Sequence, residues 1–432
     1  MNKKAVEWLY QQLPELVDKG ILPAESAEQI RKYYGPVDGN AGTRTFLVIF
    51  GVIGALLVGL GIILILAHNW AQLTKLNRLV VSLVLLAAAQ VLAGSVLWFK
   101  RDSTAWREGA GTLLMLMVGA AMALVGQTYH LVEDTDAFLL TWMLLSLPVV
   151  YLLNSASVAM LYTVGITFWA GSHYGLSKQW IWGLFGLALP HYWGLLKHSR
   201  YANTTAISLW VLTVCFYICF TTAFSDYLAG LGFLVFSALF AVTYLGGELG
   251  FISSPGQGRL LPFTAVGLAG SIGLTFILTF NEIWRNVALA WNSIQPVAWV
   301  IAAVLLLMVV VGNVALLKSR QLEAGKFAVL PGIVGLAYLI QGYDHSGFGA
   351  TLIVNVYMLS LSISLIAQGV KKFHLGIVNL GMIMLAALIV ARFFDIDVSF
   401  VVRGVIFVLL GIGFLVANVM LVRRKAGWQH EK

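Results

Sequence analysis

The chain has 432 residues, of which 59% are hydrophobic and only 11% are charged, and its mean hydropathy is +0.87. This composition lies far outside that of water-soluble domains and predicts an integral membrane protein. The formal net charge of +8 does not indicate nucleic acid as a partner, because the basic residues gather in short loops between apolar runs.

Residues 1–45 differ from the rest because they carry many charged side chains, and they predict a small soluble head. Residues 5–17 place apolar side chains on one stripe of a helix, Gly20 suits the end of that helix, and Pro23 opens a second one. A helical hairpin of this size is too small to be stable alone. We therefore expect it to cover the ends of membrane helices, or to bind a cytoplasmic protein partner through residues 1–40.

Residues 46–422 form the predicted transmembrane domain. A bilayer needs about 20 apolar residues per spanning helix, and apolar runs near that length recur along the chain without the alternation of a β-barrel. We expect about fourteen transmembrane helices, at residues 46–67, 79–99, 111–127, 137–153, 157–174, 180–196, 205–224, 227–248, 260–280, 296–317, 327–341, 350–368, 374–393 and 399–422. The predicted fold class is therefore all-α, a polytopic membrane helix bundle behind a small soluble helical hairpin.

The loops predict an orientation. If the N-terminus lies inside, the cytoplasmic segments hold most of the 27 Lys and Arg residues, including those of a basic tail at 423–432. Lys and Arg are enriched in cytoplasmic loops, so both termini are predicted to be cytoplasmic. The loops that then face outward are rich in Asp and Glu.

Short segments of the first half are similar to segments of the second half, among them Gly61 to Asn69 with Gly273 to Asn281. Matching segments would run in the same direction through the membrane. This predicts two parallel repeats of six helices, residues 46–200 and 260–422, with two helices inserted at 205–248. In transporters, such repeats place the substrate site at their interface.

Polar side chains within the predicted spans form one set of candidate site residues. Gln90, Asn355 and Asn379 lie near mid-span, and Asn313 lies toward the cytoplasmic side. Such side chains commonly bond between helices, contributing about 0.6 kcal/mol on average. The alternative is that they line a polar cavity of a carrier.

Charged side chains at the predicted outer ends of the helices form a second set. They are His130, Glu133, Asp134, Asp344, His345, Arg392, Asp395, Asp397 and Arg403. If their segment is helical, His130, Glu133 and Asp134 have a spacing that could bind a metal or relay a proton; a solvated acidic loop is the alternative. Arg392 and Arg403 flank a turn with two aspartates, which predicts either structural ion pairs or contact with an anion or a lipid headgroup.

The sequence contains no GxxxxGK[ST], HExxH, CxxC or GxSxG motif. We therefore assign no catalytic residue, metal or cofactor and do not expect an enzyme. Cys215 and Cys219 lie four residues apart in one apolar run, where we expect them to pack in the membrane rather than to form a disulfide.

Several segments resemble a family of predicted bacterial inner-membrane proteins that is catalogued as a domain of unknown function. They are the head WLYQQLPELVDKGILPAESAEQIRKYYG, then GVIGALLVGLGIILILAHNW, GQTYH with LTWMLLSLPVVYLL, and the terminal ARFFDIDVSFVVRGVIFVLLGIGFLVAN. The resemblance implies a multi-pass protein of the bacterial inner membrane with a short cytoplasmic head. It transfers no active-site residue.

Two functions are compatible with these features. The first is a secondary transporter, exporter or lipid-handling carrier, whose substrate would be a small molecule, an ion or a lipid. The second is a sensor or scaffold that does not transport and signals through its cytoplasmic head. The lipid bilayer is the partner common to both.

Overall fold

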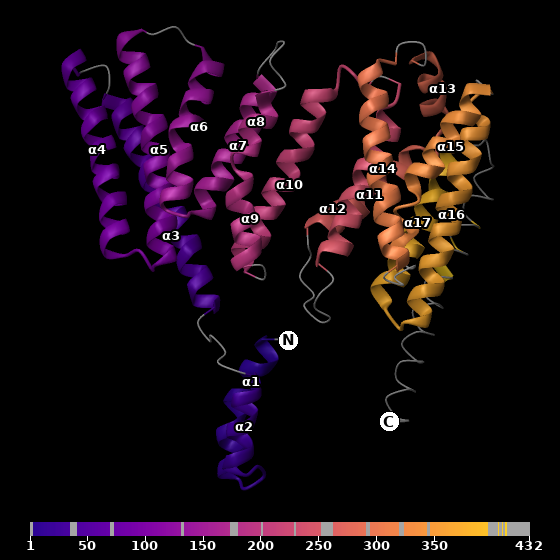
Figure 1. Cartoon of the computed structure of the whole chain (residues 1–432), viewed down its shortest axis with the longest axis horizontal. Coiled ribbons are helices and arrows are strands. Elements are labelled where there is room, and N and C mark those ends of the chain that lie inside the picture. Colours follow the sequence, from indigo (N-terminus) through magenta and orange to yellow (C-terminus); the bar gives the residue numbers. More distant parts are fainter. Residues whose placement is uncertain are drawn as a thin grey trace. The chain divides into compact units, whose positions relative to one another are not determined.

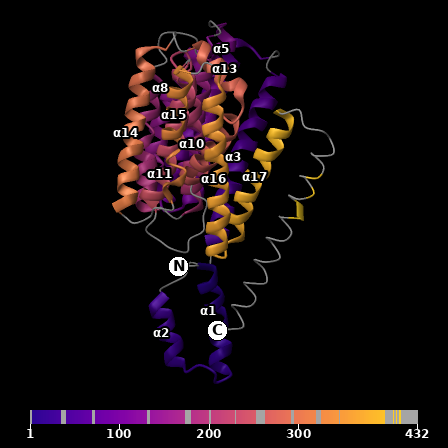
Figure 2. The same ribbon diagram turned by 90° about the vertical axis from the view of Figure 1, so that its right-hand side faces the viewer.

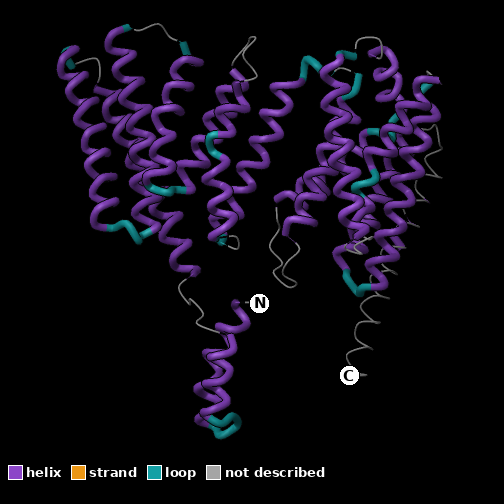
Figure 3. The backbone as a smooth tube through the Cα atoms, in the orientation of Figure 1, coloured by secondary structure: helices purple, strands orange, loops and turns teal. Residues whose placement is uncertain are grey.

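The computed structural model describes residues 3–34, 41–69, 73–130, 134–172, 180–199, 202–228, 230–251, 262–290, 294–318, 324–343 and 346–395, together with positions 405, 408, 411 and 412. Throughout these residues the regular structure is helical, and no strand is present in them (Figure 3). The predicted all-α class is confirmed.

The head is a hairpin of α1 (Lys3–Asp18) and α2 (Ala24–Tyr34). Gly20 ends the first helix with a φ of +67°, a conformation that glycine adopts without strain, and its N–H donates to the carbonyl of Val17. Val6, Leu13 and Ala27 are buried between the two helices. The predicted hairpin is therefore present, with a very small core.

The chain divides into two compact units. Unit 1 contains α1 to α10, and unit 2 contains α11 to α17. The two helices predicted as an insertion at 205–248 are thus divided between the units, since α10 belongs to the first and α11 to the second.

Unit 1 is built around α5. The helices that follow the head are α3 (Ala41–Asn69), α4 (Lys75–Phe99), α5 (Thr104–Tyr129), α6 (Thr135–Leu152), α7 (Ala156–Ser172), α8 (Trp180–Gly186), α9 (Leu189–His198) and α10 (Asn203–Phe224) (Figure 1). α5 packs against α3, α4, α6 and α7, and α7 packs in turn against α10. Val150, Val158, Tyr162 and Ile166 are fully buried in the core that these contacts form.

Unit 2 is built from pairs of long helices. They are α11 (Gly232–Phe251), α12 (Pro262–Ile277), α13 (Asn281–Ala290), α14 (Pro296–Lys318), α15 (Leu330–Tyr343), α16 (Phe348–Lys371) and α17 (Leu375–Asp395), with a short 3₁₀ turn at Ala324–Lys326. α11 packs against α14 and α15, and α16 lies along α17 (Figure 2). Glycine permits this close approach, because a Cβ on Gly381 would lie 2.8 Å from the carbonyl oxygen of Ser362.

Eight of the described helices are long and apolar enough to cross a membrane: α4, α5, α6, α10, α11, α14, α16 and α17. The number is nine if α12 and α13, which meet at an angle of 90°, form one span. Described helices coincide with every predicted run from 46–67 to 374–393, but several are short, so the count of about fourteen stays a prediction. Apart from four positions, the run at 399–422 lies outside the described residues.

Two predicted runs are not single straight helices. The run at 180–196 is broken between α8 and α9, because Pro190 has no N–H to donate to the carbonyl of Gly186. The run at 260–280 ends in turns at Thr279 and Phe280, and the chain then continues as α13 rather than as the expected loop. Both breaks leave backbone carbonyls without their ordinary helical partners.

The predicted repeat stays a prediction. Helices at corresponding positions have different neighbours: α4 packs against α5, whereas its expected counterpart α14 packs against α11.

Candidate functional site

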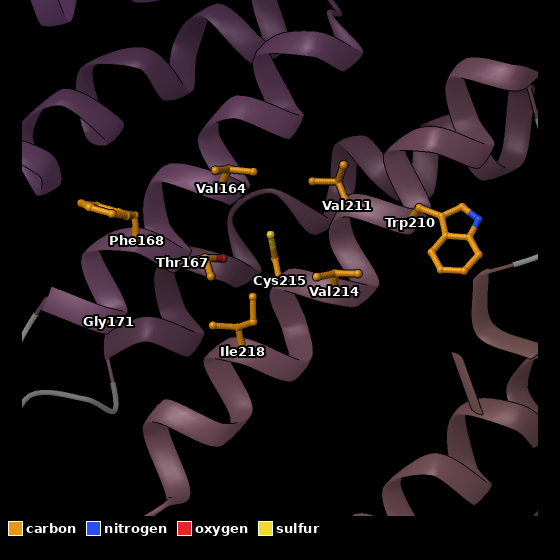
Figure 4. A pocket seen from close by; sticks show the side chains of 9 residues that line it. All are labelled: Val164, Thr167, Phe168, Gly171, Trp210, Val211, Val214, Cys215 and Ile218. Carbon is orange, nitrogen blue, oxygen red and sulfur yellow. The ribbon is translucent and has the colours of Figure 1, made fainter. Parts of the chain in front are cut away.

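A cavity of about 770 Å³ lies between α7 and α10 in unit 1 (Figure 4). It is lined by Val164, Thr167, Phe168 and Gly171 of α7 and by Trp210, Val211, Val214, Cys215 and Ile218 of α10. Its volume falls within the range of small-molecule sites, about 300–1,000 Å³. The lining is almost entirely hydrocarbon; the polar groups on it are a hydroxyl, a thiol and an indole N–H.

The cavity is open to the surroundings of unit 1. Phe168 is 66% exposed, and Val164, Val214 and Ile218 are each close to half exposed. Cys219, one turn beyond Cys215 on α10, is instead fully buried, and its thiol contacts the hydroxyl of Thr167 at 3.5 Å. The cavity therefore lies beside a tight contact between α7 and α10.

Both cysteines are free and buried, as the sequence analysis predicts. Cys215 also lines the cavity, which sequence reasoning missed.

A line of buried polar groups runs along α7 from the cavity toward α9. The Thr167 hydroxyl donates to the carbonyl of Thr163 at 2.8 Å. The Thr163 hydroxyl in turn lies 2.9 Å from the phenol oxygen of Tyr192 on α9. The first of these bonds ends on the backbone of Thr163 and the second on its side chain, so two separate hydrogen bonds lie between the cavity and the segment where the run at 180–196 is broken.

Tyrosines satisfy the carbonyls at that break. The Tyr162 hydroxyl donates to the carbonyl of Leu184 at 3.0 Å, and the Tyr151 hydroxyl donates to the carbonyl of Leu187. The latter carbonyl is available because the N–H of His191 donates to Ala188 instead. Membrane proteins tolerate broken helices only where such partners are supplied.

His191 lies directly after this break and is only 5% exposed. Its ring lies perpendicular to that of Tyr151, with the ring centroids 6.4 Å apart and the planes at 88°. Its Nε2 has no hydrogen-bond partner among the described residues. A buried imidazole nitrogen without a partner is uncommon and requires an explanation.

Glu108, in the second turn of α5, is 3% exposed. Its carboxylate accepts the N–H groups of Ala156 and Ser157, at 2.9 and 2.8 Å, and the hydroxyls of Ser155 and Ser157, both at 2.6 Å. It therefore occupies the positive N-terminal end of α7. Sequence reasoning missed this residue because it precedes the run at 111–127 and reads as a loop charge.

The polar residues predicted within the spans are divided between the two units. Gln90 is exposed on α4 of unit 1, while Asn313, Asn355 and Asn379 belong to unit 2. None of the four is among the residues that line the cavity between α7 and α10.

Two of these residues make bonds between structural elements. Asn313 donates to the carbonyls of Val309 and Ala328, at 2.9 and 3.5 Å. Asn355 donates to Thr279 at 3.0 Å and to Thr351 at 2.8 Å, so it satisfies a carbonyl at the α12–α13 bend. Asn379 is half-buried on α17, and its Oδ1 has no partner in the described part of the chain.

The predicted outer-face set is only partly described. Asp134 accepts the N–H groups of Asp136 and Ala137 and so caps α6, while His130 ends α5 in a left-handed conformation with a φ of +50°. His130 and Asp134 therefore cap two different helices, because α5 stops at a left-handed residue and α6 starts from a new cap. Glu133 lies outside the described residues, so the site expected for the three side chains stays a prediction.

Arg392 places its guanidinium 5.3 Å from the ring centroid of Phe280, at the α12–α13 bend. The remaining members of the set lie outside what the structure describes: Glu133, Asp344, His345, Asp397 and Arg403 are not described, and neither is the side chain of Asp395. The ion pairs and the anion contact predicted for this region stay predictions.

Residues 14–159 match a family model described as "Predicted membrane protein (DUF2157)", a domain of unknown function. The matched segment runs from the end of α1 to the first turn of α7, so it includes Glu108 and the serines that hold it. The expected resemblance is confirmed for this part of the chain. No curated protein and no solved structure matches the chain.

Proposed function

We propose that the protein is a lipid-handling membrane carrier that binds an acyl chain, or another apolar molecule, in the cavity between α7 and α10. The observation that carries this proposal is the cavity itself, about 770 Å³ of space lined by Val, Ile, Phe and Trp side chains. α10 is long and apolar enough to cross a membrane. The cavity would therefore open to hydrocarbon, where lipid chains are the most abundant apolar molecules.

The lining chemistry favours an apolar substrate over an ion. A charged or strongly polar substrate that leaves water must recover its hydrogen bonds inside the protein, or lose several kcal/mol. The Thr167 hydroxyl already donates to the carbonyl of Thr163, and the Cys215 side chain is buried. No lining residue is charged. An acyl chain requires only van der Waals contact and a fitting shape.

The test uses the purified full chain in phospholipid vesicles with a photoactivatable fatty acid. We expect cross-links to peptides that contain residues 164–171 and 210–218. Val214→Trp fills the cavity and should reduce labelling about tenfold, equivalent to about 1.4 kcal/mol of binding free energy. Transfer of a fluorescent phospholipid between leaflets should fall in parallel.

Val300→Trp is the matched control, because Val300 is a 62% exposed valine on the surface of α14. It adds the same indole without changing the cavity, so labelling and transfer should match the native chain. Equal labelling of the native chain and Val214→Trp would refute the proposal.

A sensor or scaffold is the second candidate, and the head is the observation that favours it. The hairpin buries Val6, Leu13 and Ala27 but leaves Tyr33 83% exposed and Ile21 64% exposed. Exposed apolar side chains on so small a module suit a protein partner. Deletion of residues 1–40 should then abolish recovery of that partner while leaving lipid labelling intact; unchanged recovery would count against this function.

A further inference from the structure

The cavity between α7 and α10 lies at the middle of a helix that is long enough to cross a bilayer. α10 has 22 residues, or about 33 Å at 1.5 Å per residue, close to a hydrocarbon core of about 30 Å. Its lining residues run from Trp210 to Ile218 and are centred on Val214. Seven residues of α10 precede them and six follow, so about 9–10 Å of helix separates the cavity from either end. In a bilayer the cavity would therefore lie near the midplane.

The inner wall of the cavity is closed by packed side chains. Cys215, which lines the cavity, belongs to a buried cluster that includes Phe185 and Cys219, and each of the three is at most 5% exposed. Phe168 and Val214 of the lining are instead 66% and 47% exposed. A ligand would therefore enter sideways, from the lipid beside the middle of α10, and not from the water at a helix end.

The hydroxyls beside the cavity already donate within their own helices. Thr167, Thr213 and Thr221 each donate to the carbonyl four residues earlier, at 2.8, 2.7 and 2.9 Å. The other polar groups on the lining are the Trp210 indole N–H and the Cys215 thiol, which is a weak donor, and no lining residue is charged. A carboxylate or phosphate placed there would lose its hydration without compensation.

The apolar part of the lining has a fixed shape. Four of its nine residues are valine or isoleucine: Val164, Val211, Val214 and Ile218 (Figure 4). In a helix these β-branched side chains keep largely to one χ1 rotamer. The wall is therefore formed before a ligand binds, and little freedom is lost when a hydrocarbon of matching shape enters.

We propose that this cavity recognises the methyl-terminal part of a lipid chain, so that substrates are selected by their tails and not by their headgroups. The inference rests on the proposed lipid-handling function and names its substrate class, which is lipids that share a tail whatever polar group the tail carries. The chains of the two leaflets end at the midplane, which is the height of the cavity. The polar group then stays at the interface, about 9–10 Å of helix beyond the cavity.

The first experiment compares two photoactivatable fatty acids of equal length, in phospholipid vesicles that hold the full chain. One carries its diazirine at the methyl end and the other carries it beside the carboxyl group. We expect the methyl-end probe to label peptides with residues 164–171 and 210–218 several-fold more strongly. Equal labelling by the two probes, or stronger labelling by the carboxyl-end probe, would overturn tail recognition.

A control separates recognition by the cavity from depth in the bilayer. Leu307 is 64% exposed and lies at the middle of α14, so labelling of its peptide reports depth alone. The cavity peptides should be labelled above this reference by the methyl-end probe. Val214→Trp should remove the excess and leave the α14 signal unchanged, and an excess that survives in this variant would count against the cavity.

The second experiment keeps the tail and changes the polar group. A fatty acid, its methyl ester and a phosphatidylcholine carry the same methyl-end diazirine chain. We expect the ratio of cavity labelling to α14 labelling to be the same for all three, and to fall when the tail is shortened. A ratio that depends on the polar group would overturn the proposal.

Two conservative variants test the polar groups of the lining. Thr167→Val removes the hydroxyl and Trp210→Phe removes the indole N–H, and both should keep the labelling of the native chain. A fall confined to the fatty acid would show that its carboxylate is bound, which would overturn tail recognition. Absence of labelling by every probe would instead refute the lipid-handling function itself.

Discussion

Ser157 donates twice to one oxygen of Glu108, through its backbone N–H at 2.8 Å and through its hydroxyl at 2.6 Å. The two residues belong to the first turn of α7 and the second turn of α5, and both are buried. Their contact joins the start of α7 to the second turn of α5.

Glu108→Ala should be strongly destabilising. The substitution leaves the N–H groups of Ala156 and Ser157 buried without their acceptor and removes the carboxylate that two serine hydroxyls share, at a cost of about 3 kcal/mol. The measurement is the midpoint of unfolding in a denaturing detergent. Glu282→Gln is the control, because Glu282 is exposed on α13 and lies 3.8 Å from Arg285; it should leave the midpoint unchanged. A Glu108→Ala chain as stable as the native one would show that the contact contributes little.

Gly119→Ala should disrupt the packing of α5 against α6. A Cβ at Gly119 would overlap the indole ring of Trp142, which is held in place by a 2.8 Å bond from its Nε1 to the carbonyl of Met115. We expect a loss of about 1–3 kcal/mol from this overpacking. Gly126→Ala on the same helix meets no atom within 4 Å and should be neutral or slightly stabilising. Unfolding curves of the two variants would contradict this prediction if they were identical.

Tyr162→Phe should loosen the α8–α9 break. The Tyr162 hydroxyl is the donor to the carbonyl of Leu184, and its removal should cost about 1 kcal/mol. Amide hydrogen exchange in residues 184–192 should become faster. Tyr343→Phe removes a hydroxyl from a 93% exposed side chain and serves as the control. Equal exchange in the two variants would mean that this bond does not hold the break.

The two cysteines offer a direct test of access to the cavity. A membrane-permeant maleimide should modify Cys219→Ser, which retains the thiol of Cys215 on the cavity wall. Cys215→Ser should stay unmodified, because Cys219 is fully buried. Mass spectrometry of the intact chain gives the yield, and prior binding of a fatty acid should reduce it. Modification of both variants at the same rate would indicate that the label enters by local opening rather than through the cavity.

Several features of the fold follow directly from local sequence. The apolar runs coincide with described helices from α3 to α17, except that α13 lies where a loop is predicted, since the length and hydropathy of a run report on its own helix. Gly20 and Pro23 likewise locate the turn of the head hairpin. The sequence pattern did not reveal that the run at 180–196 is broken, because Pro190 can kink a helix, start one or interrupt it, depending on what neighbouring helices supply.

The candidate site depends on tertiary structure more than the individual helices do. The sequence offers Asn313 and Asn355 as candidate cavity residues. In the structure the side-chain amide of each donates to a backbone carbonyl of another segment. The cavity is formed instead by ordinary apolar side chains of α7 and α10, which look like any lipid-facing residues in the sequence. Thr163 and Tyr192, 29 positions apart, become a polar connection only when α7 and α9 lie side by side.

The sequence alone determined that this is a helical membrane protein with a small charged head, because solvent preference is a property of each segment by itself. The tertiary structure decided which ionisable side chains are buried and which groups surround them. In the sequence, Glu108 is one acidic residue near the end of a loop. In the structure, α5 packs against the start of α7, and four donors surround the Glu108 carboxylate, among them the N–H of Ser157, 49 positions away. His191 is buried against the ring of Tyr151 for the same reason, since burial and ring contact are properties of the packed helices.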